Sequence, residues 1–222
     1  MRVYQFMSAE HGLQNLKHRR LKVSLLEDLN DPFELLGARL DRAEQRAQLR
    51  SWRQYMARIS RMLCFSKSYM NPVLWSHYAD KHRGLCLAFE VPRELLLDVT
   101  YDAERLAIDF EAEARRQSGV SPETAGRLLT TKFADWKYEQ EVRLFVKPEE
   151  VSSSGGLQFF SFSDQLSLRA VYVGARSAVT KRQVQAALRS EDQNALIHAT
   201  RLAFKSFRII RTPWHAVRST DA

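Results

Sequence analysis

Short apolar runs, each bounded by polar or turn-forming residues, recur along the chain. Such runs predict strands when they are rich in β-branched and aromatic residues. The segment 84–91 is a strong example, because a glycine precedes the run LCLAFEV. We expect strands over 2–6, 21–25, 62–66, 84–91, 141–146, 157–162, 169–174, 199–204 and 207–211, with a further short strand that ends near Tyr101.

Helices are predicted where apolar residues recur at helical spacing behind a capping residue. Ser8 is suited to cap a helix that ends at His18, and Ser121 with Pro122 opens another helix. The segments LNDPFE and SSSGG (152–156) read as an irregular turn and a loop. We expect helices over 8–18, 35–61, 102–117, 122–135 and 178–189, and helical turns over 72–80 and 92–97. The long helix over 35–61 can be continuous or broken once.

Strands and helices are mixed without regular alternation, which favours an α+β fold over a doubly wound α/β fold. With 222 residues, the chain has the length of one domain. We therefore predict a single α+β domain over 1–212, with a central mixed or antiparallel sheet, flanking helices and a tail over 213–222.

The composition of the chain indicates the cellular compartment and excludes some classes of protein. No apolar run is long enough for a membrane span, and residues 1–14 lack the apolar stretch of a secretory signal. Cys64 and Cys86 stand in apolar runs, where a buried thiol is the common case. We expect a cytoplasmic protein that has no membrane partner. The chain also lacks the known zinc, calcium, P-loop and dinucleotide-binding signatures, so no metal site is predicted.

The formal net charge of +8 is concentrated in the last third of the chain. Residues 151–222 hold ten Lys and Arg against four Asp and Glu. Within the expected helix 35–61, arginines at spacings of 3, 4, 4 and 3 would share one side, beside an apolar stripe of Leu36, Leu40, Ala43 and Ala47. Both features suit phosphate binding, although a solvated helix face is the plainer explanation. These arginines are Arg39, Arg42, Arg46, Arg50 and Arg53.

Three polar clusters are the candidates for chemistry. The first is Asn30, Asp31 and Glu34 in LNDPFE. The second lies in FSKSYMNPVLWSHYAD and contains Ser66, Trp75, His77 and Tyr78. The third is Glu139, Glu141 and Arg143 in WKYEQEVRLF, which an extended chain would place on one face.

Each cluster also has a purely structural explanation. Asp31 is suited to cap a helix that starts at Pro32. Trp75 and Tyr78, one helical turn apart, are suited to the core, and His77 to an ordinary polar contact. The third cluster, Glu139 with its neighbours, is equally compatible with a solvated ladder of ion pairs.

The segments LNDPFE, MLCFS, LWSHYADKHRGLCLAFE and WKYEQEVRLF, with Lys132 shortly before the last, have the order and spacing of a bacterial family. The chain resembles this family, catalogued as domain of unknown function 2971, from about Tyr4 to Ile210. The family name carries no activity.

A more distant similarity is to the ADP-ribosyltransferases, in particular the DarT-type enzymes that modify nucleic acid. This resemblance implies a split sheet and a pocket for NAD, built from a first-strand residue, a residue after a second strand and a late glutamate. The corresponding positions are Tyr4 or Phe6, then Ser66 with Trp75 and Tyr78, and then Glu141. Here Glu141 would stabilise the positive charge on the ribose, and Tyr78 or Trp75 would stack on the nicotinamide.

The same resemblance implies further roles and partners. Glu139 would act as general base and Ser66 would bind the amide of the leaving ring. We assign Glu141, Glu139, Tyr78 and His77 to catalysis. The resemblance also suggests a toxin or phage-defence effector that modifies nucleic acid or protein and has a neutralising partner. The residues expected to bind NAD are Tyr4, Phe6, Asn30, Asp31, Glu34, Ser66, Trp75 and Arg143.

Two other functions are compatible with the same residues. A nuclease would hold Mg²⁺ with Asp31, Glu34, Glu139 and Glu141, and Lys132 or His77 would lie near the metal. Alternatively, a binding module without catalysis would grip single-stranded nucleic acid with aromatic side chains and arginines.

Overall fold

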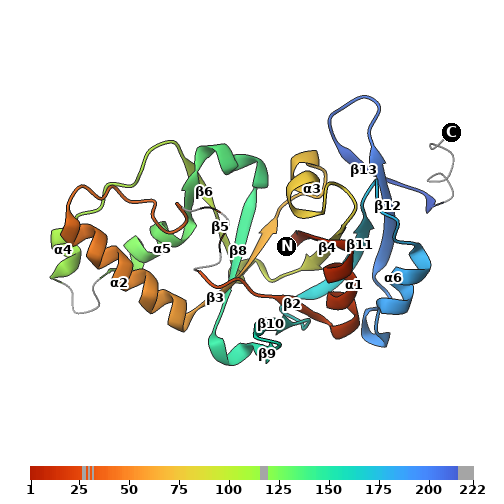
Figure 1. The fold of residues 1–222 in the computed structure, drawn as a ribbon, viewed down its shortest axis with the longest axis horizontal. Coiled ribbons are helices and arrows are strands. Elements are labelled where there is room, and N and C mark those ends of the chain that lie inside the picture. The colour runs from red at the N-terminus through yellow and green to blue at the C-terminus, as the bar shows by residue number, and fades with distance from the viewer. Residues whose placement is uncertain (27–28, 30, 32, 116–119, 215–222) are drawn as a thin grey trace.

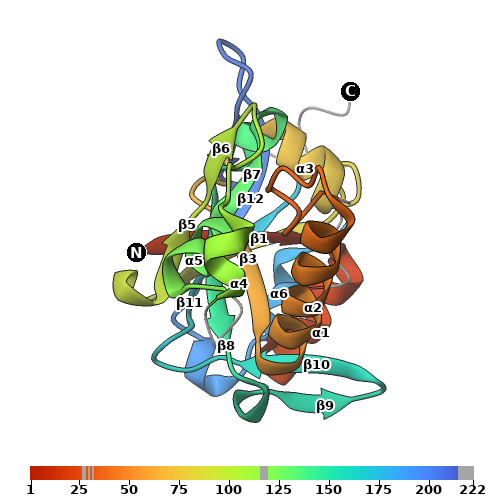
Figure 2. The ribbon, with the colours of Figure 1, turned by 90° about the vertical axis from the view of Figure 1, so that its left-hand side faces the viewer.

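A computed structural model describes residues 1–26, 29, 31, 33–115 and 120–214. It shows a single α+β domain, as predicted, with an eight-stranded mixed sheet and helices around it (Figures 1 and 2). The order across this sheet is β13-β12-β11-β4-β1-β3-β8-β5, and every neighbouring pair is antiparallel except β11 and β12. The strands of the main sheet are β1 (Arg2–Met7), β3 (Arg61–Ser66), β4 (Leu85–Glu90), β5 (Leu96–Asp98), β8 (Glu141–Val146), β11 (Ser167–Val173), β12 (Leu196–Leu202) and β13 (Ile209–Thr212).

Two small sheets and the helices complete the fold. One small sheet contains β2 (Arg20–Lys22), β10 (Leu157–Ser161) and β9 (Ser152–Ser154), and the other pairs β6 (Thr100–Asp102) with β7 (Thr131–Phe133). No helix in the described part of the chain is both long and apolar enough to cross a membrane. The α-helices are α1 (Ala9–His18), α2 (Ala43–Ile59), α3 (Pro72–Tyr78), α4 (Phe110–Ala114), α5 (Pro122–Thr130) and α6 (Lys181–Ala187), and the 3-10 helices are η1 (Arg93–Leu95), η2 (Ala134–Glu139), η3 (Pro148–Glu150) and η4 (Ser190–Asp192).

The main sheet is weakly joined at its centre. Strands β1 and β4 pair at six positions, and so do β3 and β8. Between β1 and β3, however, the only register pair is Tyr4 with Ser66. We call this place the split. It divides the sheet into a larger part that ends at β1 and a smaller part that begins at β3.

Alternation along the strands separates the core into layers. Val3, Leu63 and Leu144 belong to the largest apolar cluster, on one face of the sheet. On the other face, one cluster lies around Trp52 and Phe110, and another lies around Trp75 and Tyr172. Figure 1 shows α2, α4 and α5 at one end of the molecule and α1 with α6 at the other.

The expected helix over 35–61 is wrong in its first part. Leu35 has a left-handed φ of 60°, and Leu35 and Ala38 are buried as irregular chain. Gly37 and Arg39 exchange backbone hydrogen bonds with Leu106, so a distant segment fixes this stretch instead of a helix. Helix α2 begins only at Ala43, behind Arg42.

The arginine row and its apolar stripe change accordingly. Arg39 and Arg42 lie outside α2, so the five arginines do not share one helix face. The helix buries Leu49 and Trp52, whereas Ala43 and Ala47 are exposed and Leu36 and Leu40 precede the helix.

Three other elements also differ from the prediction. Among residues 102–115, which the structure describes, only Phe110–Ala114 is a helix. Helix α5 ends at Thr130 because Thr131–Phe133 pairs with β6. The segment 152–156 is no loop: β9 pairs with β10 across a two-residue turn, in which Gly155 and Gly156 both have positive φ. This is the backbone that a tight hairpin requires.

Candidate functional site

A pocket of about 290 Å³ lies at the split. Its walls come from Tyr4, Gln5 and Phe6 on β1, and from Cys64, Phe65 and Ser66 on β3. Because the two strands part after a single register pair, the space between them is open to a ligand. The remaining lining residues are Ser24, Leu29, Glu34, Leu74, Tyr78, Lys132, Glu139 and Glu141.

Tyr4, Ser66 and Glu141 form a row across three neighbouring strands. Tyr4 is the register partner of Ser66, and Ser66 is the register partner of Glu141. Register partners project their side chains from the same face of a sheet. The row therefore presents a phenol, a hydroxyl and a carboxylate along one wall of the pocket.

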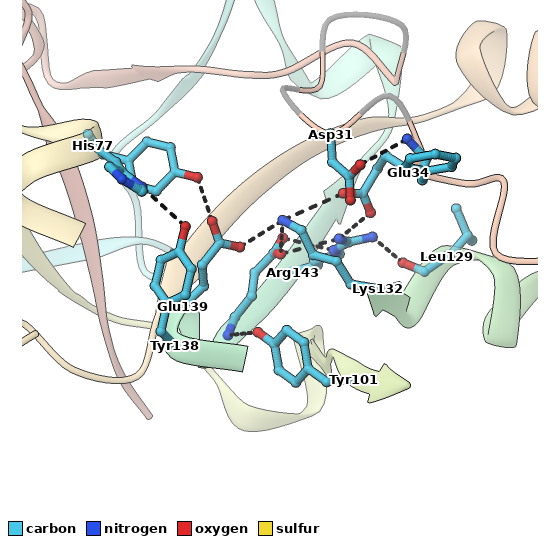
Figure 3. Close-up of polar contacts among 12 residues, drawn as sticks. Asp31, Glu34, His77, Tyr101, Leu129, Lys132, Tyr138, Glu139 and Arg143 are labelled. Atoms are coloured by element: carbon cyan, nitrogen blue, oxygen red, sulfur yellow. Dashed lines mark hydrogen bonds and ion pairs between the residues drawn. The ribbon is translucent and has the colours of Figure 1, made fainter. Parts of the chain in front are cut away.

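Lys132 is the centre of a buried charge cluster (Figure 3). Its ammonium lies 2.7 Å from Glu139, 3.2 Å from Glu141 and 3.6 Å from Glu34. All four side chains are less than a tenth exposed. Buried charges of this kind persist only when they are paired, and Lys132 is a partner of all three carboxylates.

Arg143 is the second cation of this cluster and has no exposed surface. It donates from Nε to Glu141 at 2.9 Å, from one terminal nitrogen to the carbonyl of Leu129 at 2.5 Å, and from the other to Glu34. The backbone N–H of Glu141 donates to the hydroxyl of Tyr101 at 2.7 Å. Glu141 is thereby held at both its side chain and its main chain.

Burial and the two cations affect the carboxyl groups differently. Burial opposes ionisation of Glu141, but Arg143 and Lys132 outweigh it and lower the pKa of Glu141. For Glu34, burial prevails over the same two cations, and its pKa is raised. Lys132 loses solvation as well, yet the carboxylates around it raise its pKa, so it stays an ammonium.

A second set of polar contacts lies at the edge of the pocket. Tyr78 donates from its hydroxyl to Glu139 at 2.5 Å. His77 and Tyr138 approach each other at 3.1 Å, Nδ1 to hydroxyl. Helix α3, which carries Tyr78 and His77, is capped by Asn71, whose side chain also donates to the carbonyl of Tyr138. The cap therefore connects α3 to the segment that bears Glu139.

The structure brings together most of the residues singled out in the sequence. The prediction that one extended strand presents Glu139, Glu141 and Arg143 is wrong. Glu139 is the last residue of η2, and the left-handed Gln140 turns the chain into β8, which begins at Glu141. Arg143 does not line the pocket but binds Glu141, which does. The predicted residues that line the pocket are Tyr4, Phe6, Glu34, Ser66, Tyr78, Glu139 and Glu141.

Other predicted residues lie elsewhere. Trp75 has no exposed surface and packs edge-to-face on Phe6, so it is a core residue and not a wall on which a ring could stack. His77 is exposed and outside the pocket lining. Asp31 is buried and accepts from the backbone N–H of Phe33 at 2.9 Å, which makes it a turn residue. Asn30 lies outside the described residues.

Tyr101 and Gln5 were missed in the sequence. Nothing near Tyr101 in the chain indicates that its hydroxyl reaches β8. The side-chain oxygen of Gln5 is buried and has no hydrogen-bond partner among the described residues. A glutamine within an otherwise apolar-and-aromatic strand was the available signal for a polar site there.

The cluster also bears on the magnesium alternative. The ammonium of Lys132 occupies the space among Glu34, Glu139 and Glu141 where a divalent ion would have to lie. Among the described residues, no group of His, Cys, Asp and Glu side chains has the arrangement of a metal site.

Comparison of the chain with protein-family models, with curated proteins and with solved structures found no significant match. The functional argument therefore depends on the geometry of the pocket.

Proposed function

We propose that the protein is an NAD⁺-dependent ADP-ribosyltransferase whose active site is the pocket at the split. The observation that carries this proposal is the row of Tyr4, Ser66 and Glu141. The resemblance to ADP-ribosyltransferases assigns the NAD pocket to a first-strand residue, a residue at the end of a second strand and a late glutamate. Residues distant in the chain are neighbours here, on the wall of one pocket.

The charge of the cluster supports the same chemistry. Three carboxylates, of Glu34, Glu139 and Glu141, face two cations, Lys132 and Arg143. With all five groups ionised, the cluster carries one net negative charge. When the bond between the ribose and nicotinamide breaks, its electron pair leaves with the ring nitrogen, and positive charge develops on the ribose. A fixed carboxylate beside that charge lowers the barrier, and Glu141 is ionised and held for this role.

The remaining roles follow from position. Tyr78, Tyr4 and Phe6 are the aromatic side chains of the lining that could contact the nicotinamide, since Trp75 is buried elsewhere. Ser66 would bind the carboxamide. The acceptor would attack the ribose carbon as the nicotinamide leaves, and Glu139 would take its proton.

The size of the pocket limits what it can hold. About 290 Å³ is at the lower end of the range for small-molecule sites. We expect it to enclose the nicotinamide and its ribose, while the adenosine half lies outside. A role as a toxin or phage-defence effector with a neutralising partner stays a prediction from the resemblance.

The test is release of nicotinamide from NAD⁺, with water as acceptor, combined with calorimetric titration of NAD⁺. Binding without metal, and nicotinamide release that Glu141→Gln reduces at least 100-fold, would support the proposal. The exposed Glu149→Gln is the matched control and should behave as the wild type. Unchanged release by a folded Glu141→Gln, or binding of Mg²⁺ in place of NAD⁺, would contradict it.

A further inference from the structure

The hairpin between β12 and β13 carries the two most exposed large apolar side chains of the described residues. Phe204 is 84% exposed and Phe207 is 98% exposed. In both ribbon views, the hairpin projects from the body of the molecule beyond α3 (Figures 1 and 2). Exposing two phenylalanines costs solubility, so they point to an interaction surface.

The charge around these rings has one sign. The described residues 193–214 contain four Lys and Arg and no Asp or Glu. Lys205 and Arg208 lie in the loop with the rings, while Arg201 and Arg211 stand on the two strands behind it. The guanidinium of Arg201 lies 4.6 Å from the centre of the Phe204 ring. The ring of Phe207 has no such contact with a cation among the described residues.

The base of the hairpin adjoins the pocket. The backbone N–H of Ile209 donates to the carbonyl of Met70, in the loop that joins Ser66 to α3. Beneath this contact, ring contacts run from the hairpin strand to the wall of the pocket. They join His198 to Tyr172, Tyr172 to Tyr69, and Tyr69 to Tyr4.

We infer that this hairpin binds single-stranded nucleic acid. Exposed rings interleaved with cations are what such a strand requires, because its bases stack on aromatic side chains and its phosphates pair with Lys and Arg. A duplex hides its base faces, so it would engage the cations alone. Arg201 is the register partner of Ile210 and Arg211 that of Thr200, so the two arginines project from opposite faces of the hairpin. A flexible strand can contact both faces, whereas the flat surface of an anionic membrane cannot.

Oligonucleotide binding at the hairpin does not depend on the proposed function, because the rings and cations that would make it lie outside the pocket lining.

The experiment measures fluorescence anisotropy of labelled single-stranded DNA and RNA of about 20 nucleotides, without NAD⁺. A duplex of the same sequence and vesicles containing phosphatidylserine are the comparison ligands. We expect tighter binding to one or both single strands than to duplex or vesicles. We expect Phe204→Ala with Phe207→Ala to weaken it at least tenfold, because each substitution removes a ring on which a base would stack.

The charge contribution is tested separately. Lys205→Ala with Arg208→Ala should reduce the slope of log affinity against log salt by about 1.4, for two lost phosphate contacts. The controls are Tyr55→Ala, which removes a ring that is 57% exposed on α2, and Lys181→Ala with Arg182→Ala on α6. These controls should bind as the wild type does.

Equal binding of single strands and duplex, preference for vesicles, or unchanged affinity of the phenylalanine variant would each overturn the inference. Failure of the proposed function gives a different result: oligonucleotide binding would persist in a protein that neither binds NAD⁺ nor releases nicotinamide.

Discussion

The ammonium of Lys132 lies 3.2 Å from the carboxylate of Glu141, and both side chains are almost completely buried. The lysine approaches from β7 and the glutamate opens β8, with η2 between them. This contact therefore closes a short turn of chain around Glu139. It makes the candidate catalytic carboxylate part of the structural core as well as part of the pocket.

Removing the lysine tests this double role. In Lys132→Met, Arg143 still pairs with Glu34 and Glu141, but Glu139 loses the ammonium with which it pairs. We expect a loss of about 3–5 kcal/mol in the free energy of unfolding at neutral pH. Urea denaturation measures it. Lys137 is an exposed lysine of η2. The free energy of unfolding of Lys137→Met should differ from that of the wild type by less than about 0.5 kcal/mol. Equal losses in the two variants would contradict the importance of the buried pairs.

The two carboxyl groups with opposite pKa shifts should give opposite pH dependences. The folded-state pKa of Glu141 is lowered, so its contribution to stability is present above the unfolded-state pKa of about 4.3 and is lost as the pH falls through the folded-state pKa. The folded-state pKa of Glu34 is raised, so its contribution is present below about 4.3 and is lost as the pH rises through the folded-state pKa.

We therefore expect the stability of the wild type relative to Glu141→Gln to increase from acidic pH to about pH 5. Relative to Glu34→Gln, wild-type stability should instead decrease as the pH rises above about 4.3. Denaturant unfolding of the three proteins across this pH range measures both slopes. Two slopes of the same sign would show that one of the assigned shifts is wrong.

The turn after α3 offers a matched pair of backbone substitutions. Asp80, Lys81 and His82 all have left-handed φ, and a Cβ on Gly84 would lie 2.0 Å from the carbonyl oxygen of Met7. Gly84→Ala should thus destabilise the fold by about 3 kcal/mol, the upper part of the range for overpacking. Lys81→Gly relieves a left-handed residue and should stabilise by about 0.5–1 kcal/mol. Thermal unfolding compares them, and a stabilising Gly84→Ala would refute this packing.

Two aromatic residues of α3 should separate core from pocket. Trp75→Phe leaves a cavity next to Phe6 and should lower stability by about 1–3 kcal/mol while NAD⁺ affinity per folded molecule is unchanged. Tyr78→Phe keeps the ring but removes the hydroxyl that donates to Glu139. We expect it to slow nicotinamide release with little effect on stability. If Trp75→Phe changed the NAD⁺ affinity more than Tyr78→Phe does, Trp75 would have to line the pocket, which would contradict its assignment to the core.

The sequence predicted the elements that are fixed by local pattern. Strands β1, β3 and β8 and helices α1 and α3 appear within one or two residues of their expected bounds, because alternation and capping are written in adjacent residues. The start of α2 was missed because backbone hydrogen bonds to Leu106, far along the chain, hold 37–39 in an extended path. Local spacing carries no information about such a contact.

The candidate site shows the same division. Glu139, Glu141 and Arg143 were recognised as a group because they are close in sequence. The central position of Lys132 was not foreseen, because it depends on how η2 turns the chain back. The spacing of Trp75 and Tyr78 by one helical turn makes both equally suited to the core. Only tertiary packing decides that Trp75 is buried and that Tyr78 faces Glu139.

The single register pair of Tyr4 with Ser66 also has a mechanical consequence. Within either part of the sheet, neighbouring strands pair at three to six positions, whereas β1 and β3 pair at one. Bending at this hinge breaks fewer hydrogen bonds than bending anywhere within either half. A ligand that enters there can widen its own cavity by spreading two rigid plates, without the cost of unfolding either one.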